Sequence, residues 1–377
     1  MKITGIETQV WRSRESKGEV HPAWAPGTSW STRRTTIFVV NTDEGLSGIG
    51  SGVGSPEFVA NMIAPRLVGQ DPFLFEKHTD TLRNTGGPWL GHPIVWGIEM
   101  ALWDLLGKAT GQPLWKLWGG ATNRVRAYAS MIELRSPEQR AEDALKYLEL
   151  GYRAIKLRIH SWTMKEDIAQ VEAVRKAVGD RMEIMVDANQ AQTPGTPRNA
   201  DGPVWTFERA VATCRELERL GVRWLEEPMP RFAFDDLSRL TEASNVPIAG
   251  GENNVGLHEF RLLIDRNCYD IIQADAVCSE GMFQLRKVAA YAEMHNKLFV
   301  PHHGGSAIGI AAHMSLSGGC PNSPYVELLQ DLPVLSAADF QGLIAPPYFE
   351  PDSEGYVYLT DKPGLGVELG EAWERVV

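Results

Sequence analysis

Three acidic residues follow three successive strand-like segments: Asp187 in EIMVDANQ, Glu226 in VRWLEEP and Glu252 in VPIAGGE. If these segments are neighbouring parallel strands, their carboxyl ends bring the three side chains to one point. Mg²⁺ prefers oxygen ligands, and three carboxylates leave part of its octahedral shell open for a substrate. The pattern therefore predicts a metal-assisted enzyme with these three residues as metal ligands. Glu227 is left out, because adjacent residues on a strand point to opposite faces.

Basic residues alternate along the preceding strand-like segment, YRAIKLRIH. Alternation puts Lys156, Arg158 and His160 on one face and apolar Leu157 and Ile159 on the other. Cations that point into a barrel are costly to bury unless they meet anions. We expect either a network of ion pairs with carboxylates of neighbouring strands or a cationic pair that faces an anionic substrate.

Two later segments carry an acid and a pair of histidines: Asp275 in QADA, and His302 and His303 in VPHH. A carboxylate hydrogen-bonded to a histidine on the next strand fixes the tautomer of the ring and raises its basicity. We therefore predict that Asp275 and His302 form a general acid/base dyad, and a contact from His303 would move the assignment by one residue. Glu327, in YVELL, is the contribution of the last strand, although alone it could equally be a partly buried carboxylate.

A barrel is needed to position these candidates. From residue 125, strand-like runs alternate with amphipathic helical runs, which is typical of βαβ units and a parallel sheet. Eight strand candidates lie between Arg126 and Leu329, and eight parallel strands close a barrel whose chemistry lies at the carboxyl ends of the strands. A Pro/Gly-rich insertion at about 192–205 interrupts this pattern just after Asp187.

Residues 1–122 follow a different pattern. Two strand-like segments, ITGIETQVW and TTIFVVNTDEGLSGIGSG, precede helical patterning from about Glu57, and Asp43-Glu44-Gly45 breaks the second segment as a hairpin. We expect an α+β cap of three strands followed by helices, with Gly119-Gly120 at the boundary. At 377 residues the chain is too long for one ordinary core, so a barrel plus a smaller domain is the natural partition.

The composition excludes several classes of protein. The net charge of −11, with no long basic run to offset it, argues against nucleic-acid binding. The four cysteines show no CxxC pairing, and the start MKITGIETQV lacks the apolar core of a signal peptide, so we expect a reducing cytoplasm. No apolar run approaches the roughly 20 residues of a membrane-spanning helix, so we expect no membrane segment.

Seven features in order, each at a strand end, resemble one known family. The chain is similar to the enolase superfamily, specifically its mandelate racemase subgroup of acid-sugar dehydratases and racemases, and ALWDLLGKATGQPLWKLWGG resembles the segment that joins that family's cap to its barrel. The resemblance covers essentially the whole chain. It rests on Lys156-x-Arg158, Asp187-x-Asn189, Glu226-Glu227-Pro228, Gly251-Glu252-Asn253, Asp275, His302 and Glu327.

The resemblance implies a fold and a division into domains. The expected fold is α/β, a modified TIM barrel of the (β/α)7β type with an N-terminal α+β capping domain. Residues 1–122, joined by the C-terminal segment 350–377, would form the cap, and residues 123–349 the catalytic barrel. We also expect a homo-oligomer that acts on a small molecule.

The resemblance also implies roles for single residues. Mg²⁺ would be the cofactor of Asp187, Glu226 and Glu252, with Asp275 and His302 as the acid/base dyad. A protonated Glu327 would donate a hydrogen bond to the substrate carboxylate, Lys156 would hold the developing negative charge, and Asn189 would face the substrate. A lid at about 18–32 would close the mouth, and it offers three candidate contacts to the substrate: His21, Trp24 and Trp30. The two tryptophans could instead simply pack the cap on the barrel.

One departure from the family pattern bears on the reaction. Many relatives have Lys-x-Lys where this chain has Lys156-Leu157-Arg158, and the second lysine is their base on one face of the substrate. Arginine keeps its proton at any working pH and suits a bidentate clamp on a carboxylate, so two-base racemisation is put in doubt. We expect a Mg²⁺-dependent dehydratase of a sugar acid, with His302 acting first as base and then as acid, or with Lys156 as the base if burial lowers its pKa.

Two alternatives stay open at this point. Within enzymes, the chain could be a racemase, epimerase or cycloisomerase of a related carboxylate. Outside them, it could be a catalytically idle relative that binds a ligand, which the full set of metal ligands and the dyad speak against.

Overall fold

This computed structural model describes residues 1–85, 95–191 and 202–376. Eight parallel strands, with the helices that connect them, form the larger of its two parts. Strand pairing runs in chain order from β4 to β10, and β11 returns to pair with β4. The N–H of Phe299 on β10 donates at 3.0 Å to the carbonyl of Asn322, which lies in the segment that leads into β11. The strands are β4 (Arg124–Ser130), β5 (Ala154–Arg158), β6 (Glu183–Asp187), β7 (Leu225–Glu226), β8 (Ile248–Gly250), β9 (Ile271–Ile272), β10 (Leu298–Phe299) and β11 (Tyr325–Leu329).

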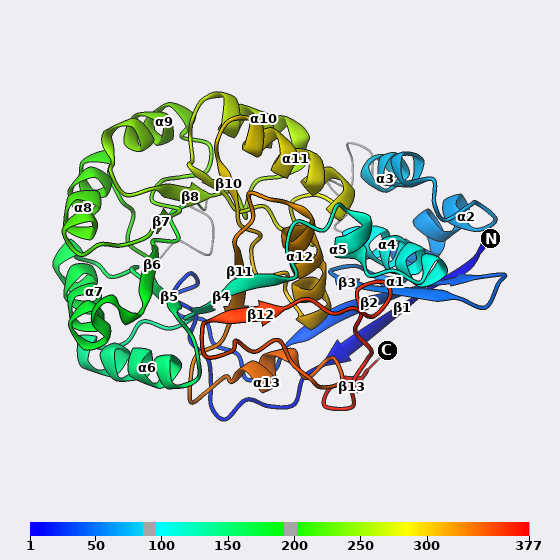
Figure 1. The fold of residues 1–377 in the computed structure, drawn as a ribbon, viewed down its shortest axis with the longest axis horizontal. Helices are drawn as coiled ribbons and strands as arrows, with labels where there is room; N and C mark the ends of the chain where they lie inside the picture. The colour runs from blue at the N-terminus through cyan, green and yellow to red at the C-terminus, as the bar shows by residue number, and fades with distance from the viewer. Residues whose placement is uncertain (86–94, 192–201, 377) are drawn as a thin grey trace.

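A helix follows each of the first seven strands, so the (β/α)7β barrel is confirmed. Figure 1 shows α6 to α11 as an arc around the strands. Local sequence starts several of these helices: Ser136 with Gln139, and Thr163 with Glu166, form reciprocal capping boxes that satisfy free N–H groups in the first turn. The helices are α6 (Pro137–Glu149), α7 (Met164–Val178), α8 (Phe207–Arg219), α9 (Phe234–Ala243), α10 (Gly256–Asp265), α11 (Met282–Met294) and α12 (Ala307–Gly319).

The cap is an antiparallel sheet with helices against it. Strands β1 (Ile3–Arg12), β2 (Arg34–Thr42) and β3 (Ser47–Gly52) pair in order, and α4 (Trp96–Thr110) packs on β3 and β2. The α+β cap of three strands followed by helices is therefore present, with a fourth strand added from the far end of the chain. The other cap helices are α1 (Pro56–Phe58), α2 (Ala64–Leu67), α3 (Phe75–Asn84) and α5 (Leu114–Leu117), with a π-helical turn at Val59–Ile63.

The C-terminal segment contributes to both parts of the molecule. After α13 (Ala337–Gln341), strand β12 (Tyr356–Tyr358) pairs antiparallel with barrel strand β4, whereas β13 (Glu374–Arg375) pairs with β1 and lies beside it in Figure 1. The division at residue 122 stays a prediction, because cap residues such as Ile37 and Met100 belong to the same hydrophobic core as the barrel. None of the described helices is both long enough and apolar enough to cross a membrane.

Candidate active site

The three predicted metal ligands come together at the carboxyl ends of adjacent strands. Asp187 ends β6, Glu226 ends β7, and Glu252 lies two residues beyond β8. Each offers an oxygen atom, and these atoms all lie within 4.8 Å of one another. Gly251 has a φ of 124°, a conformation that favours glycine, and it lets the chain turn so that Glu252 reaches the other two. Burial and mutual repulsion raise the pKa of all three carboxyls, so nearby cations are needed to stabilise their ionised forms.

Strand β5 supplies two of those cations. Lys156 Nζ lies 2.7 Å from Glu226 and 2.8 Å from Glu327, and Arg158 forms an ion pair with Asp187. Arg158 also donates through Nε to Met131 O at 2.7 Å. We expected this strand to form either an ion-pair network or a cationic pair facing a substrate. The structure shows the first, an ion-pair network with carboxylates of neighbouring strands.

The predicted dyad is also present. His302 Nδ1 lies 2.8 Å from Asp275 Oδ2, so the contact falls to His302 and not to His303. The opposite ring nitrogen, Nε2, lies 3.0 Å from Glu252 Oε2 and therefore faces the carboxylate cluster. Burial alone would lower the pKa of His302, but Glu252, Asp275 and Glu327 raise it to about 10. Asp275 thus orients a histidine whose free nitrogen points to the candidate metal site.

Lys156 and Glu327 lie together inside the barrel, and their charges depend on each other. Burial by itself lowers the pKa of Lys156, but Glu226, Glu327 and Asp187 raise it above its ordinary value, so this lysine holds its proton here. Lys156 and His302 in turn hold the pKa of Glu327 below its ordinary value despite its burial. Hydrogen-bond donation by Glu327 requires its protonated form, whereas the carboxyl is ionised in this arrangement. That role stays a prediction for the substrate-bound protein.

Asn189 lies beside the cluster and supports one of its carboxylates. Its backbone N–H donates to Asp187 Oδ1 at 2.8 Å, and its amide donates to Oδ2 at 3.1 Å. Nη1 of Arg158 donates to Asn189 Oδ1 at 3.3 Å. Asn189 therefore orients Asp187, and its contact with a substrate stays a prediction.

The predicted lid lies against the barrel, and its three candidate residues differ. The ring of Trp24 covers the Arg158 guanidinium, with 4.8 Å between the Cζ atom and the ring centroid. Trp30 pairs through its backbone with Val20 and packs on the main core. The structure does not bring His21 to the site, because its side chain is 64% exposed and lies nearest Glu19. Of the insertion at 192–205, residues 192–201 lie outside the described residues.

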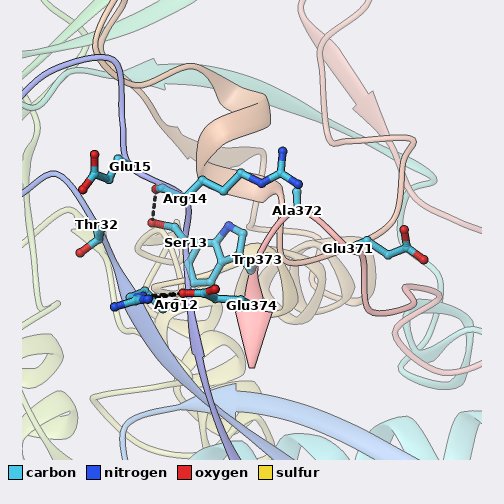
Figure 2. A pocket seen from close by; sticks show the side chains of 9 residues that line it. All are labelled: Arg12, Ser13, Arg14, Glu15, Thr32, Glu371, Ala372, Trp373 and Glu374. Carbon is cyan, nitrogen blue, oxygen red and sulfur yellow. Dashed lines mark hydrogen bonds and ion pairs between the residues drawn. The ribbon is translucent and has the colours of Figure 1, made fainter. Parts of the chain in front are cut away.

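A separate polar hollow of about 440 Å³ opens at the edge of the cap (Figure 2). An ion pair between Arg12 and Glu374 crosses it, and Ser13 donates a hydrogen bond to Arg14 O at 2.8 Å. None of its described lining residues belongs to the carboxylate cluster, so it is not the candidate active site. Its wall nevertheless includes Trp373, which lies 5.8 Å from the Arg33 guanidinium at the end of the lid.

The reason given for leaving out Glu227 was wrong, although this residue is not part of the triad. Strand β7 stops at Glu226, and Glu227 has a φ of 45°, so simple alternation of faces no longer applies. Its side chain is buried and accepts a hydrogen bond from Asn253 at 2.8 Å, and burial together with Glu252 and Asp187 raises its pKa well above the ordinary value. Sequence reasoning overlooked this carboxyl because it assumed an extended backbone.

Two further residues that had no predicted role hold Glu226 in place. Gln273 Nε2 donates to Glu226 Oε2 at 2.8 Å, and Trp224 Nε1 donates to the same atom at 3.2 Å. Each lies two residues before a predicted site residue, Asp275 or Glu226, at the end of β9 or the start of β7. That spacing was the signal that could have identified them.

The charges around the triad fit a divalent cation. Six buried or half-buried carboxyl groups face three cationic side chains, Lys156, Arg158 and His302, within the described part of the chain. Oxygen ligands and an excess of negative charge suit a hard ion such as Mg²⁺. The six carboxyl groups are those of Asp187, Glu226, Glu227, Glu252, Asp275 and Glu327.

Family profiles match both parts of the chain. Residues 8–119 match the mandelate racemase / muconate lactonizing enzyme N-terminal domain, and residues 139–373 match the enolase C-terminal domain-like family. The chain belongs to the enolase superfamily. Within that superfamily it resembles the mandelate racemase and muconate lactonizing enzyme group, as the strand-end residues predicted.

Relatives within the enolase superfamily carry different activities. The chain is 29% identical to an arabinonate dehydratase of Saccharolobus solfataricus, covering 88% of this chain and 87% of the relative. It is 28% identical to a D-galactarolactone cycloisomerase of Agrobacterium fabrum, covering 98% and 97%. Among solved structures, a racemase from Streptomyces coelicolor A3(2) with bound magnesium superposes with a TM-score of 0.83 at 26% identity, covering 97% of each chain. The enolase superfamily fold is thus shared across three reactions.

Proposed function

We propose that this protein is a Mg²⁺-dependent dehydratase of a sugar acid, an aldonate or an aldarate. It would remove the proton α to the carboxylate, pass through an ene-diolate and eliminate the β-hydroxyl to give a 2-keto-3-deoxy acid. The observation that carries this proposal is the Asp275–His302 dyad facing the carboxylate triad from one side, with arginine where a second base would stand.

The residues present fit the metal. Asp187, Glu226 and Glu252 would hold it, as their clustered oxygens and excess negative charge favour. A bound Mg²⁺ supplies a Lewis acid that stabilises negative charge on the carboxylate oxygens of the substrate.

His302 would carry the proton in both halves of the reaction. Its Nε2 faces the triad, and Asp275 fixes the proton on Nδ1, so Nε2 would be the nitrogen that takes the α-proton. This role requires a neutral ring, whereas the contact with Glu252 raises the pKa of His302 in the present arrangement, so Glu252 would have to bind the metal instead of His302. The same nitrogen, once protonated, would donate to the departing β-hydroxyl. Lys156, which carries a proton beside Glu226 and Glu327, would stabilise the negative charge that develops on the substrate.

Arg158 favours dehydration over two-base racemisation. A racemase needs an acid/base group on each face of the α-carbon, and the described residues of β5 offer Lys156 and Arg158 for the second face. Arg158 keeps its proton, since Asp187 and other carboxylates raise its pKa further despite burial. A cycloisomerase starts from the same α-proton chemistry, and the relative of that name makes it the second candidate.

The proposal is tested by incubating the protein with a panel of mono- and diacid sugars and Mg²⁺ in ²H₂O. Formation of 2-keto acid that stops with EDTA is the expected result. Exchange of the α-proton without keto acid would identify a racemase or epimerase, and lactone opening or closure would identify a cycloisomerase. Binding of a panel member without any conversion would identify a ligand-binding relative.

A further inference from the structure

A second histidine lies directly beside the dyad and has no part in the proton transfer proposed above. The ring centroids of His302 and His303 are 4.1 Å apart. His303 is half-buried, and its ring also meets Phe340 edge-on at 6.0 Å. It therefore belongs to the wall of the site rather than to the outer surface.

The hydrogen bonding of His303 fixes its tautomer. The backbone N–H of Gly305 donates to His303 Nδ1 at 2.9 Å, so Nδ1 must be unprotonated and the ring proton lies on Nε2. Within the described part of the chain Nε2 makes no hydrogen bond, and it is not among the buried polar atoms that lack a partner. Nε2–H is thus a neutral donor that is not sealed inside the protein.

Arg33 holds the turn that fixes this tautomer. Its Nη2 donates to Gly305 O at 2.6 Å, while its guanidinium stacks 3.8 Å from the centroid of Phe340. Burial keeps the pKa of His303 well below the ordinary value, and the neighbouring charges of His302 and, to a smaller extent, Arg33 act in the same direction. Arg33 directly follows the predicted lid, so the lid base and His303 are linked through one residue, Gly305.

We propose that His303 is a second substrate-binding imidazole, which donates its Nε2–H to a hydroxyl oxygen of the substrate, with Arg33 as the residue that positions it. Because Nδ1 is occupied by a donor, His303 can give a hydrogen bond but does not exchange a proton in the reaction. Because the rings of His303 and His302 are 4.1 Å apart, the hydroxyl that His303 binds would lie on a substrate carbon close to the reacting carbons. This inference rests on the proposed function and adds a residue that recognises a hydroxyl of the sugar acid besides the one that is eliminated.

The test compares two substitutions of His303 on the sugar acid that the wild-type protein converts best. His303→Phe keeps a ring but removes the donor, and His303→Gln keeps a donor. His295→Phe is the control, because His295 is exposed at the end of α11, where its ring lies 4.7 Å from that of Tyr291. We expect His303→Phe to lower kcat/KM by about 10- to 100-fold through KM, with His303→Gln within about fivefold of wild type. The control should match wild type.

Two measurements keep the outcome clear. In ¹⁵N-histidine spectra of the wild-type protein, His303 should carry its proton on Nε2, and Mg²⁺ with the substrate should shift that resonance. Arg33→Met should change the tautomer of His303 and raise KM, whereas a merely structural Arg33 would leave both unchanged. Equal kcat/KM for His303→Phe and wild type, or an unshifted resonance, would overturn this proposal alone. If the wild-type protein converts no sugar acid at all, the proposed function fails and this inference fails with it.

Discussion

At the scale of single residues, Arg158 is held in place beside the candidate metal site. It pairs with Asp187, donates to Met131 O and Asn189 Oδ1, and lies under Trp24. These contacts use the planar, multi-donor guanidinium, which lysine cannot reproduce. Arg158 therefore orients a predicted metal ligand in addition to any contact that it makes with an anionic substrate.

Arg158→Lys should lower the affinity for Mg²⁺ about 10- to 100-fold, because residues that orient metal ligands typically contribute that much. Calorimetric titration with Mg²⁺ checks this. The variant should also raise KM, and lysine there could allow slow α-proton exchange on the opposite face in ²H₂O. Unchanged Mg²⁺ affinity would mean that Asp187 needs no support from Arg158. Arg239→Lys, on the exposed pair with Asp236, is the matched control.

Asp275→Asn should cut turnover by about 10² or more while the protein stays folded. Oδ2 of the carboxylate accepts from His302 Nδ1 and from the backbone N–H of Gly304, whereas Oδ1 accepts from the backbone N–H of Val277. Asparagine has one oxygen, so it keeps the hydrogen bonds of one side only, and the asparagine NH2 group cannot accept from His302. Steady-state kinetics with a circular dichroism melt checks both parts. Asp235→Asn, on an exposed ion pair, serves as control. A variant with full activity would remove Asp275 from the mechanism.

At the scale of elements, the predicted lid contacts the candidate site through the ring of Trp24. Ala23 N donates to Ile132 O at 2.9 Å, which anchors the lid to the end of β4, and the adjacent Trp24 covers Arg158. A lid that covers a charged group excludes water from it and strengthens the electrostatic interactions below. The tryptophans were expected either to contact substrate or to pack the cap on the barrel, and Trp24 lies where it can do both.

Trp24→Ala should alter kcat and KM together, with kcat/KM lower by about tenfold or more, because the variant leaves Arg158 open to water. His21→Ala is the control, since that side chain is exposed and pairs with Glu19 of the lid itself. Steady-state measurement of kcat and KM for the two variants on the same sugar acid checks this prediction. If His21→Ala proves the more damaging, the lid closes differently with substrate bound.

The strand-end residues show which parts of the site can be read from sequence. Asp187 and Glu226 end their strands, so the period of two and the barrel rule together placed them correctly. The same rule failed at Glu227, whereas Asn189 was identified only through the family resemblance, and both residues have positive φ values, of 45° and 49°. Side-chain direction after a strand ends depends on local backbone geometry that periodicity does not contain. The link between Arg33 and His303 joins residues 270 positions apart in sequence or more, which no local pattern predicts.

At the scale of the whole molecule, the cap and the barrel share a hydrophobic core, and a buried acid of the cap accepts a hydrogen bond from the barrel. Glu99 on α4 accepts hydrogen bonds from Phe283 N at 2.9 Å, at the start of α11, and from Trp103 Nε1 at 3.2 Å. Burial raises the pKa of Glu99 to about 7. The folded protein therefore holds this proton at pH values where the unfolded chain, with an ordinary pKa near 4.5, has lost it.

Glu99 should make stability fall as pH rises from about 4.5 to 7, since the folded state binds the proton more tightly. The contribution is complete below pH 4.5 and lost above pH 7, a change of about 3 kcal/mol at 1.36 kcal/mol per pKa unit. Glu99→Gln keeps the acceptor and removes the titration. Urea unfolding at pH 5 and pH 8 should show that the difference between wild type and variant depends on pH. A constant difference would mean that Glu99 does not titrate in this window.

The pairing of β13 with β1 brings together residues that are 362 positions apart in sequence, Arg12 and Glu374. During synthesis on the ribosome, β1 leaves the exit tunnel first, and its partner strand follows only after every barrel strand has been made. The end of β1 that β13 covers, Trp11 and Arg12, therefore lacks that partner until β13 has been made, and an open strand edge is a template for pairing with other chains. Newly made copies of this protein consequently expose this part of β1 to aggregation for as long as the ribosome takes to make the barrel.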